Sequence, residues 1–216
     1  LDGINISLDS LDPERFRKLT RMDRLASVRA GIDAASRLNF KDKKLNCVPI
    51  RGVNDDELGT LVAFGLERGF HVRFIEFMPF GSQWSPERVI SEAEVVASVE
   101  KIHGKAQAQE QKKGETARIY ELGNGGSFGI IPTISHPFCG HCNRLRLSAT
   151  GQLIPCLFSH KGTDVRALLR DDSTSPDLQN AVRESLALKG IGFLEEKHGQ
   201  NQQLNAQVRD MRGIGG

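Results

Sequence analysis

Three of the four cysteines lie close together in the second half of the chain. Cys139 and Cys142 form a C-x-x-C sequence, and thirteen residues separate Cys142 from Cys156. A C-x-x-C turn lets two thiolates converge on one metal, and a predicted hairpin returns the third thiolate to the same place. Three thiolates suit a [4Fe–4S] cluster with one iron left open for another ligand. In a chain of this size, clustered cysteines indicate metal binding more often than disulfides.

A zinc site is the alternative interpretation of the same cysteines. Three thiolates and one histidine form a common structural zinc site, and the fourth ligand could be His136, His141 or His160. A zinc knuckle usually shows a second C-x-x-C pair, and this sequence has none. Three unrelated buried thiols are the least favoured interpretation, given the spacing. Cys47 lies far upstream, and we predict that it is a core thiol.

Two arginines follow the cysteine turn directly. Arg144 and Arg146 flank Leu145 in a predicted strand, so a period of two places both guanidinium groups on one face. Paired arginines on a surface hairpin are common and are usually solvated. Their position directly after a metal-binding turn favours instead the binding of an anion or of a base edge.

The elements of the first half of the chain must position further polar residues. Strands are predicted at residues 4–9, 44–50 and 72–78. Helices are predicted to start at Asp12-Pro13, at Asn54 or Asp55, and at Ser91, which forms a capping box with Glu94. The first helical pattern is interrupted near Met22. This alternation indicates a parallel sheet or barrel in which the three strands lie side by side.

The second half of the chain has a different pattern. A polar stretch at residues 105–116 is predicted to be a linker, and a glycine-rich turn at 123–126 joins two strands into a hairpin. A second hairpin is predicted at residues 144–149 and 153–157, and helices are predicted near 163–170 and 177–188. We therefore divide the chain into two domains, residues 1–104 and 105–216.

Polar side chains interrupt the predicted strands of the first domain. Lys44 and Asn46 share one strand face, Arg73 interrupts an apolar run, and Asn5 and Ser7 line one face of the first strand. A parallel strand buried on both sides should be almost wholly apolar. These faces therefore either meet solvent or form a polar barrel interior. Charges in an interior must be paired, so the second interpretation favours a phosphate-bearing ligand.

The composition sets limits on the class of protein. The chain has 216 residues, a mass of 23.8 kDa, a net charge of +2 and 38% hydrophobic residues. This composition argues against disorder, and the balanced charge gives no reason to expect a nucleic-acid or membrane-surface binder. No apolar run approaches the roughly 20 residues that span a bilayer, so we expect a cytoplasmic protein. The chain opens directly in a predicted strand without Met, which suggests a truncated chain.

Several segments resemble, in the same order along the chain, the molybdenum cofactor biosynthesis protein A family of radical S-adenosylmethionine enzymes. The segments are residues 5–11, 44–48, 51–57, 72–79, 138–147, 156–158 and 215–216. The activity that this resemblance implies is that of a lyase, GTP 3′,8-cyclase, in molybdenum cofactor biosynthesis. The implied fold is α/β: the C-terminal part of an incomplete TIM-like barrel, plus an α+β C-terminal domain that carries an iron–sulfur cluster.

The resemblance also implies roles for individual residues. Cys139, Cys142 and Cys156 would hold a [4Fe–4S] cluster whose open iron faces the guanine of GTP. Substrate binding would fall to Lys44, Arg73, Arg144 and Arg146. Contacts to S-adenosylmethionine would come from Ser7 and Met78, and the terminal Gly215-Gly216 would reach into the active site. In the implied reaction, a 5′-deoxyadenosyl radical takes hydrogen from C3′ of the ribose, and C3′ then attacks C8 of guanine.

One family motif is missing from this sequence. The family generates its radical at a second [4Fe–4S] cluster bound by C-x-x-x-C-x-x-C, which does not occur here. We therefore expect a fragment that is inactive alone, and no catalytic residue is assigned. The alternatives are a paralogue that binds a nucleotide without turnover and a zinc-stabilised nucleotide-binding module. The family's reaction requires an electron donor, and a homodimer is compatible with the sequence.

Overall fold

The computed structural model describes residues 1–189 except 81, 113, 140–141, 160–161 and 171–174. The chain divides into two compact units. The first comprises Leu1–Met78 and Trp84–His136, and the second comprises Pro79–Gln83 and the chain from residue 137 onward.

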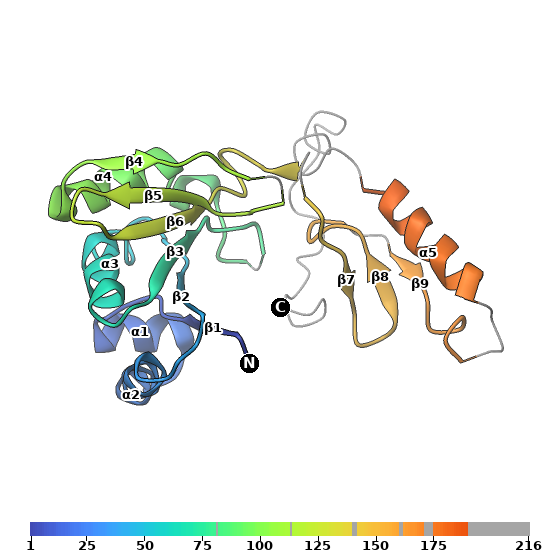
Figure 1. Ribbon diagram of the computed structural model, residues 1–216, viewed down its shortest axis with the longest axis horizontal. Helices are drawn as coiled ribbons and strands as arrows, with labels where there is room; N and C mark the ends of the chain where they lie inside the picture. The colour runs from blue at the N-terminus through green and yellow to red at the C-terminus, as the bar shows by residue number, and fades with distance from the viewer. Residues whose placement is uncertain (81, 113, 140–141, 160–161, 171–174, 190–216) are drawn as a thin grey trace. The chain divides into compact units, whose positions relative to one another are not determined.

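The first unit contains a six-stranded sheet (Figure 1). Its strand order is β1-β2-β3-β6-β5-β4. The parallel strands are β1 (Gly3–Ser7), β2 (Asp42–Cys47), β3 (His71–Ile75) and β6 (Ser127–Ile131). The antiparallel strands at the other edge are β5 (Arg118–Leu122) and β4 (Ala106–Ala108). The prediction that the first three strands lie side by side in parallel is confirmed.

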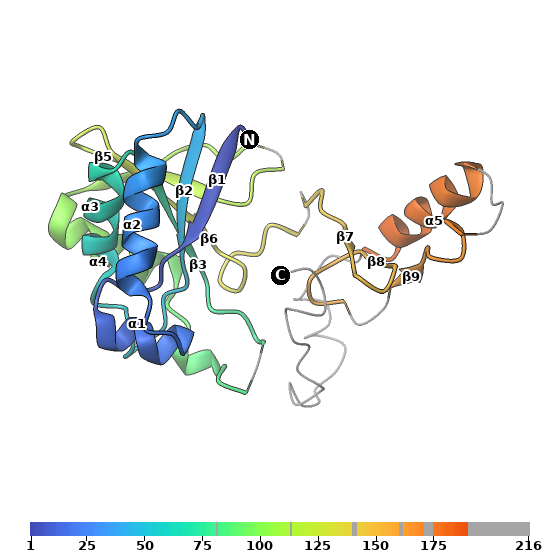
Figure 2. The ribbon, with the colours of Figure 1, turned by 90° about the horizontal axis from the view of Figure 1, so that it is seen from below.

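Four α-helices pack on one side of this sheet (Figure 2). They are α1 (Pro13–Thr20), α2 (Leu25–Ser36), α3 (Leu58–Glu67) and α4 (Glu92–His103), and a 3₁₀ turn, η1 (Pro86–Arg88), precedes α4. The sheet residues that face them are apolar and fully buried: Leu45, Val72, Phe74, Phe128 and Ile130. The first unit is therefore a two-layer α/β structure whose core lies between the helices and one face of the sheet.

The helix starts that depend on local hydrogen bonds agree with the predictions. Asp12 caps α1 by accepting the Arg15 N–H at 2.7 Å, and Pro13 is the first helical residue. Glu94 accepts the Ser91 N–H at 2.9 Å, as in a capping box. The predicted interruption near Met22 separates α1 from α2.

The predicted cap of α3 is wrong. The helix starts at Leu58, and neither Asn54 nor Asp55 caps it. The Asn54 side chain is fully buried, accepts the Ile50 N–H at 2.7 Å and donates to the Asp9 carbonyl at 2.7 Å. Asn54 therefore satisfies loop and strand-end backbone groups instead of the helix terminus.

The hairpin of β5 and β6 pairs with the sheet of the first unit, although it falls within the predicted domain of residues 105–216. Strand β6 pairs in parallel with β3, and Tyr120 and Phe128 stack with ring centroids 5.3 Å apart. Phe128 also packs edge-on against Phe74 at 6.3 Å. Aromatic burial against β3 thus explains why the two units divide after His136 instead of at residue 104. Part of the predicted linker forms the edge strand β4.

The second unit contains a small antiparallel sheet and one helix in its described residues. The strands β7 (Arg146–Leu147), β8 (Gln152–Ile154) and β9 (Thr163–Asp164) lie in that order, and α5 (Ser175–Ala187) packs against β8 and β9 (Figure 1). The helix predicted near 177–188 is confirmed. The helix predicted near 163–170 is wrong, because Thr163 and Asp164 pair with β8 and turns follow.

Candidate functional site

The face of the first sheet opposite the helices is polar. Strand register places Asn5 beside Lys44 and Asn46 beside Arg73, with all four side chains on the same face. Asn5 is exposed, and the other three are half-buried. Period-two alternation explains this arrangement, because the intervening residues face the helices. The structure thus brings Lys44 and Arg73 onto one face of the sheet, which the interpretation as a shared polar face requires.

Arg73 lies across this face toward the edge strand β1. Its Nε donates to Asn46 Oδ1 at 2.9 Å, and its Nη2 donates to Asn5 Oδ1 at 3.2 Å. Both acceptors are carboxamide oxygens, which orient a guanidinium group without neutralising its charge. The sequence showed these asparagines as polar interruptions but gave no signal that they hold Arg73.

A second cation, Lys44, and the imidazole ring of His71 lie on the same face as Arg73. Lys44 pairs with Asp42 on the same face of β2. Burial, followed by the charges of Arg73 and Lys44, lowers the pKa of His71. A lowered pKa favours the neutral imidazole, whose Nδ1 lies 3.2 Å from Ser127 Oγ.

Gly129 on β6 completes this face. A Cβ at this position would lie 3.0 Å from His71 Nε2, 3.3 Å from Arg73 Cγ and 3.4 Å from the Cβ of Ala117. The first two distances are shorter than ordinary van der Waals contact, and the third is at its lower limit. The side chains of His71 and Arg73 therefore pack closely over Gly129, and a larger residue there would require them to shift.

The two residues predicted to contact S-adenosylmethionine lie toward the carboxyl edge of the parallel strands. Ser7 is the exposed last residue of β1, and Met78 is half-buried and follows the end of β3. Carboxyl ends of parallel strands meet at one edge of a sheet, which is the usual place for a ligand in α/β proteins. Their predicted role stays a prediction.

In the second unit, the hairpin brings the cysteines toward one end. The Cys142 N–H donates to the Cys139 carbonyl at 3.2 Å, which closes the C-x-x-C turn. Arg146 pairs with Ile154, so the antiparallel register places the segments before Arg146 and after Ile154, including Cys142 and Cys156, at the same end of the hairpin. All three cysteines are half-buried thiols.

The predicted metal ligands are only partly described. No group of three or more His, Cys, Asp or Glu side chains is gathered as a metal site among the residues that the structure describes. His141 and His160 lie outside those residues, as does Gly215-Gly216. His136 belongs to the first unit, where its Nδ1 lies 3.0 Å from a Glu92 carboxylate oxygen. The cluster ligands remain a prediction that the hairpin topology fits.

Cys47 is a core thiol, as predicted. It is 1% exposed on β2, and burial raises the pKa of its thiol well above the ordinary value, with Asp9 and Glu57 adding to the effect. A thiol with so high a pKa is neither a ready nucleophile nor a ready metal ligand.

The two predicted substrate arginines differ in their surroundings. Arg146 is half-buried in β7, whereas Arg144 is exposed and precedes the strand, so the predicted strand from Arg144 is too long. The Arg144 guanidinium lies 5.9 Å from the ring centroid of Phe138. The period-two argument therefore does not place both groups on one strand face. Only their closeness in sequence to the cysteine turn supports a shared role.

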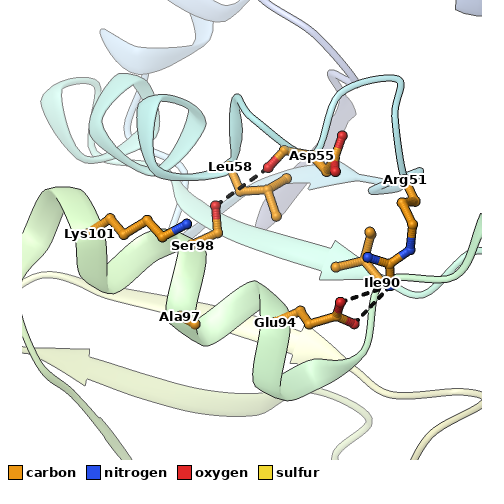
Figure 3. A pocket seen from close by; sticks show the side chains of 8 residues that line it. All are labelled: Arg51, Asp55, Leu58, Ile90, Glu94, Ala97, Ser98 and Lys101. Atoms are coloured by element: carbon orange, nitrogen blue, oxygen red, sulfur yellow. Dashed lines mark hydrogen bonds and ion pairs between the residues drawn. The ribbon is translucent and has the colours of Figure 1, made fainter.

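A cavity in the first unit lies away from these residues. It has a volume of about 240 Å³ and is lined by residues of α3, α4 and the loops before them, including Arg51, Glu94 and Lys101 (Figure 3). Arg51 pairs with Glu94 at 2.8 Å and donates to the Val89 carbonyl at 2.9 Å. These contacts connect loop to helix, so we do not assign this cavity to the substrate.

The combination of these features defines a class: an α/β protein with a polar sheet face that carries Lys44 and Arg73, and a hairpin unit that carries three clustered cysteines. The chain belongs to the Molybdenum Cofactor Synthesis C family, whose model matches residues 70–194. The resemblance seen in the sequence motifs is confirmed. The described residues contain no helix that is long and apolar enough to cross a membrane.

Curated relatives agree with this family. The chain is 35% identical over 218 residues to a GTP 3′,8-cyclase from Thermodesulfovibrio yellowstonii, covering 100% of this chain and 65% of that protein. It is 43% identical over 195 residues to a GTP 3′,8-cyclase from Pseudomonas putida, covering 88% and 58%. It is 40% identical over 179 residues to molybdenum cofactor biosynthesis protein 1 from Drosophila melanogaster, covering 82% and 32%. The chain thus spans at most 65% of the length of these three relatives.

Proposed function

We propose that this chain is the substrate-binding half of a GTP 3′,8-cyclase, a lyase of molybdenum cofactor biosynthesis. The product would be (8S)-3′,8-cyclo-7,8-dihydroguanosine 5′-triphosphate. The observation that carries the proposal is the family match over residues 70–194. This range contains Arg73, the C-x-x-C turn, Arg144, Arg146 and Cys156. The two bacterial relatives described above are named for this activity.

The polar sheet face supports binding of a triphosphate. Lys44, which pairs with Asp42, lies on this face, and so does Arg73, which donates to the side-chain oxygens of Asn46 and Asn5. A guanidinium in a fixed orientation suits the oxygens of a phosphate, because its N–H groups form a rigid fork. We assign Lys44 and Arg73 from the first unit, and Arg144 and Arg146 from the second, to hold GTP.

The cysteine hairpin supports binding of a [4Fe–4S] cluster. Cys139, Cys142 and Cys156 are the residues that would hold it, because their thiolates are soft ligands and the hairpin register brings Cys142 and Cys156 to one end. When bound, such a cluster supplies an iron with an open position for a substrate atom. The surrounding chain would orient GTP beside it and exclude water.

The remaining assignments follow from the family. We propose that the adjacent parallel strands β1, β2, β3 and β6 are the later part of an incomplete TIM-like barrel, with Ser7 and Met78 contacting S-adenosylmethionine at its carboxyl edge. The sequence has no C-x-x-x-C-x-x-C motif. The radical-generating cluster is therefore assigned to no residue of this chain.

Metal analysis after anaerobic reconstitution tests the proposal. The chain is incubated with iron and sulfide, desalted, and assayed for iron, sulfide and zinc. We expect roughly four irons per chain, lost in Cys142→Ala and kept in the matched variant Cys47→Ala. Stoichiometric zinc without sulfide would favour the zinc-stabilised binding module. Equal loss of iron in both variants would show that the ligands are assigned wrongly.

A further inference from the structure

The chain passes between the two units at three places, and the first-unit sides of all three are tied close to the end of β3. The passages follow Met78, precede Trp84 and follow His136. Met78 lies three residues beyond Ile75, the last residue of β3. The passage before Trp84 is separated from β3 by a loop, and the passage after His136 is far from β3 in sequence. Contacts of these two passages with the end of β3 therefore result from the fold and not from closeness in sequence.

Glu76 ties the third passage to the end of β3. Its side chain is 1% exposed. Glu76 Oε2 accepts the backbone N–H groups of Ile134 and Ser135 at 2.6 and 2.9 Å, and Oε1 accepts the Ser135 hydroxyl. The segment 134–136 has no helix or strand of its own. Two of its three backbone donors are thus satisfied by a single buried carboxylate.

A second buried carboxylate holds the last residue of the same segment. Glu92, the first residue of α4, is 4% exposed and accepts the Tyr120 hydroxyl at 2.8 Å. Arg118 Nη1 lies 2.9 and 3.1 Å from its two oxygens, and His136 Nδ1 lies 3.0 Å away. A carboxylate is favoured at a helix N-terminus, and its pairing with Arg118 offsets the cost of burial.

The second passage is tied to the residue that follows Glu76. The Trp84 indole Nε1 donates to the Phe77 carbonyl at 2.9 Å, and the Arg88 guanidinium lies 5.8 Å from the centroid of the Phe77 ring. Phe77 therefore contacts the second passage through Trp84, and Glu76 contacts the third passage through residues 134–135. A buried carboxylate is costly unless it is hydrogen-bonded. The Glu76 carboxylate therefore depends on its donors at Ile134 and Ser135.

We propose that Glu76 is the positioning residue of an interdomain anchor, formed by Glu76 and Phe77 together with Trp84 and residues 134–136. The anchor gathers the first-unit ends of all three passages at the carboxyl end of β3, so that the chain leaves and re-enters the first unit at one place. The inference rests on these contacts and not on the proposed function, and its test needs no substrate.

Hydrogen exchange and tryptophan fluorescence together test the anchor in the full 216-residue chain. Trp84 is the only tryptophan, so its quenching by acrylamide reports directly on the second passage. The test variant is Glu76→Gln, which keeps the size of the side chain but places an amide N–H₂ group opposite the N–H and O–H donors of residues 134–135. Glu121→Gln, an exposed position on β5 of the same sheet, is the matched control.

We expect Glu76→Gln to speed exchange at residues 134–135 by roughly tenfold or more, because both amides lose a charged acceptor. Trp84 quenching should increase at the same time, while β3 and β6 stay protected. Faster exchange at 134–135 with Trp84 quenching unchanged would mean that the passages are held independently, which overturns the shared anchor. Unchanged exchange at 134–135 would overturn it as well.

A milder variant keeps the test decisive if Glu76→Gln does not fold. Ser135→Ala removes only the hydroxyl donor to Glu76 and leaves the carboxylate with its backbone donors. We expect a smaller rise in exchange, confined to 134–135. A uniform rise that includes β3 and β6 would indicate loss of global stability, and the local anchor would then be rejected.

Discussion

Substituting Gly129 tests whether the polar face depends on a strand position without a side chain. In Gly129→Ala the new Cβ would lie 3.0 Å from His71 Nε2 and 3.3 Å from Arg73 Cγ. Ordinary contacts between such atoms are about 3.5–4.0 Å, so both side chains must move by a few tenths of an ångström. Overpacking of this kind costs about 1–3 kcal/mol, whereas replacing a strand glycine by alanine gains about 0.5–1 kcal/mol. We expect a net destabilisation of about 1 kcal/mol.

Urea unfolding of Gly129→Ala and of a matched glycine variant measures this difference. Gly31 lies on the exposed side of α2, and a Cβ there meets no atom within 4 Å. Gly31→Ala should therefore stabilise the chain by about 0.5–1 kcal/mol, the usual gain in a helix. The two substitutions are chemically identical. If the free energy of unfolding falls in Gly129→Ala and rises in Gly31→Ala, the difference reflects the steric effect on the polar face.

A second substitution identifies which neighbour resists the new methyl group. His71→Ala removes the atom that lies closest to the new methyl group. Gly129→Ala should therefore cost less stability when it is introduced into the His71→Ala variant than when it is introduced into the unmodified chain. If Arg73 holds GTP, Gly129→Ala should also weaken GTP affinity, by roughly tenfold or less, the equivalent of about 1.4 kcal/mol. Equal stabilisation in Gly129→Ala and Gly31→Ala would refute the reasoning, since the neighbours would then give way without cost.

Three further predictions concern other groups. Burial and a hydrogen bond to a neighbouring carboxylate raise the pKa of Tyr120 to about 12, so the folded chain favours the neutral phenol. Stability should therefore be lost as pH rises from about 10, the ordinary pKa, toward about 12. Tyr120 is the only tyrosine, so phenolate absorbance reports on it, and a midpoint near the ordinary value in folded protein would contradict the prediction. Arg144→Ala and Arg146→Ala should each weaken GTP binding by roughly ten- to a hundredfold, since a charge-assisted contact contributes about 1.5–3 kcal/mol. Calorimetry should show no such loss for Arg166→Ala, an exposed arginine of the same unit that pairs with Asp164. Equal GTP affinities in all three variants would indicate that Arg144 and Arg146 are solvated surface residues. The buried Cys47 thiol, with its raised pKa, should be alkylated last of the four cysteines, and labelling mapped by mass spectrometry would reject this if Cys47 reacted first.

The sequence predicted those elements whose geometry is set by neighbouring residues. Asp12 caps α1 and Ser91 pairs with Glu94 through contacts three residues apart, so a short window of sequence contains both partners. Strand alternation likewise predicted that Lys44 and Asn46 share one face of their strand, because a period of two depends only on the strand itself.

The errors and omissions involve partners that are distant in sequence. Asn54 looks like a helix cap but binds the Asp9 carbonyl, 45 residues away. Thr163 and Asp164 continue a helical pattern but pair with β8. Glu76 gave only the signal of an acid that directly follows an apolar strand, because its partners lie 58 and 59 residues further along the chain. No local pattern could reveal these contacts, which form only when the strands are assembled.

The buried core of the first unit determines which residues lie on the polar face of the sheet. Leu45 and Phe74 are buried against the helices at 2% and 0% exposure, and each is adjacent in sequence to a cation, Lys44 or Arg73. A slip of one residue in either strand would exchange the two faces, burying the cation and exposing the apolar side chain. Burial of an unpaired charge is strongly unfavourable, so the same packing that stabilises the sheet also fixes the orientation of the cationic face. The register of β2 and β3 therefore links the stability of the sheet to the orientation of Lys44 and Arg73, and a core substitution that shifts either strand should move both side chains.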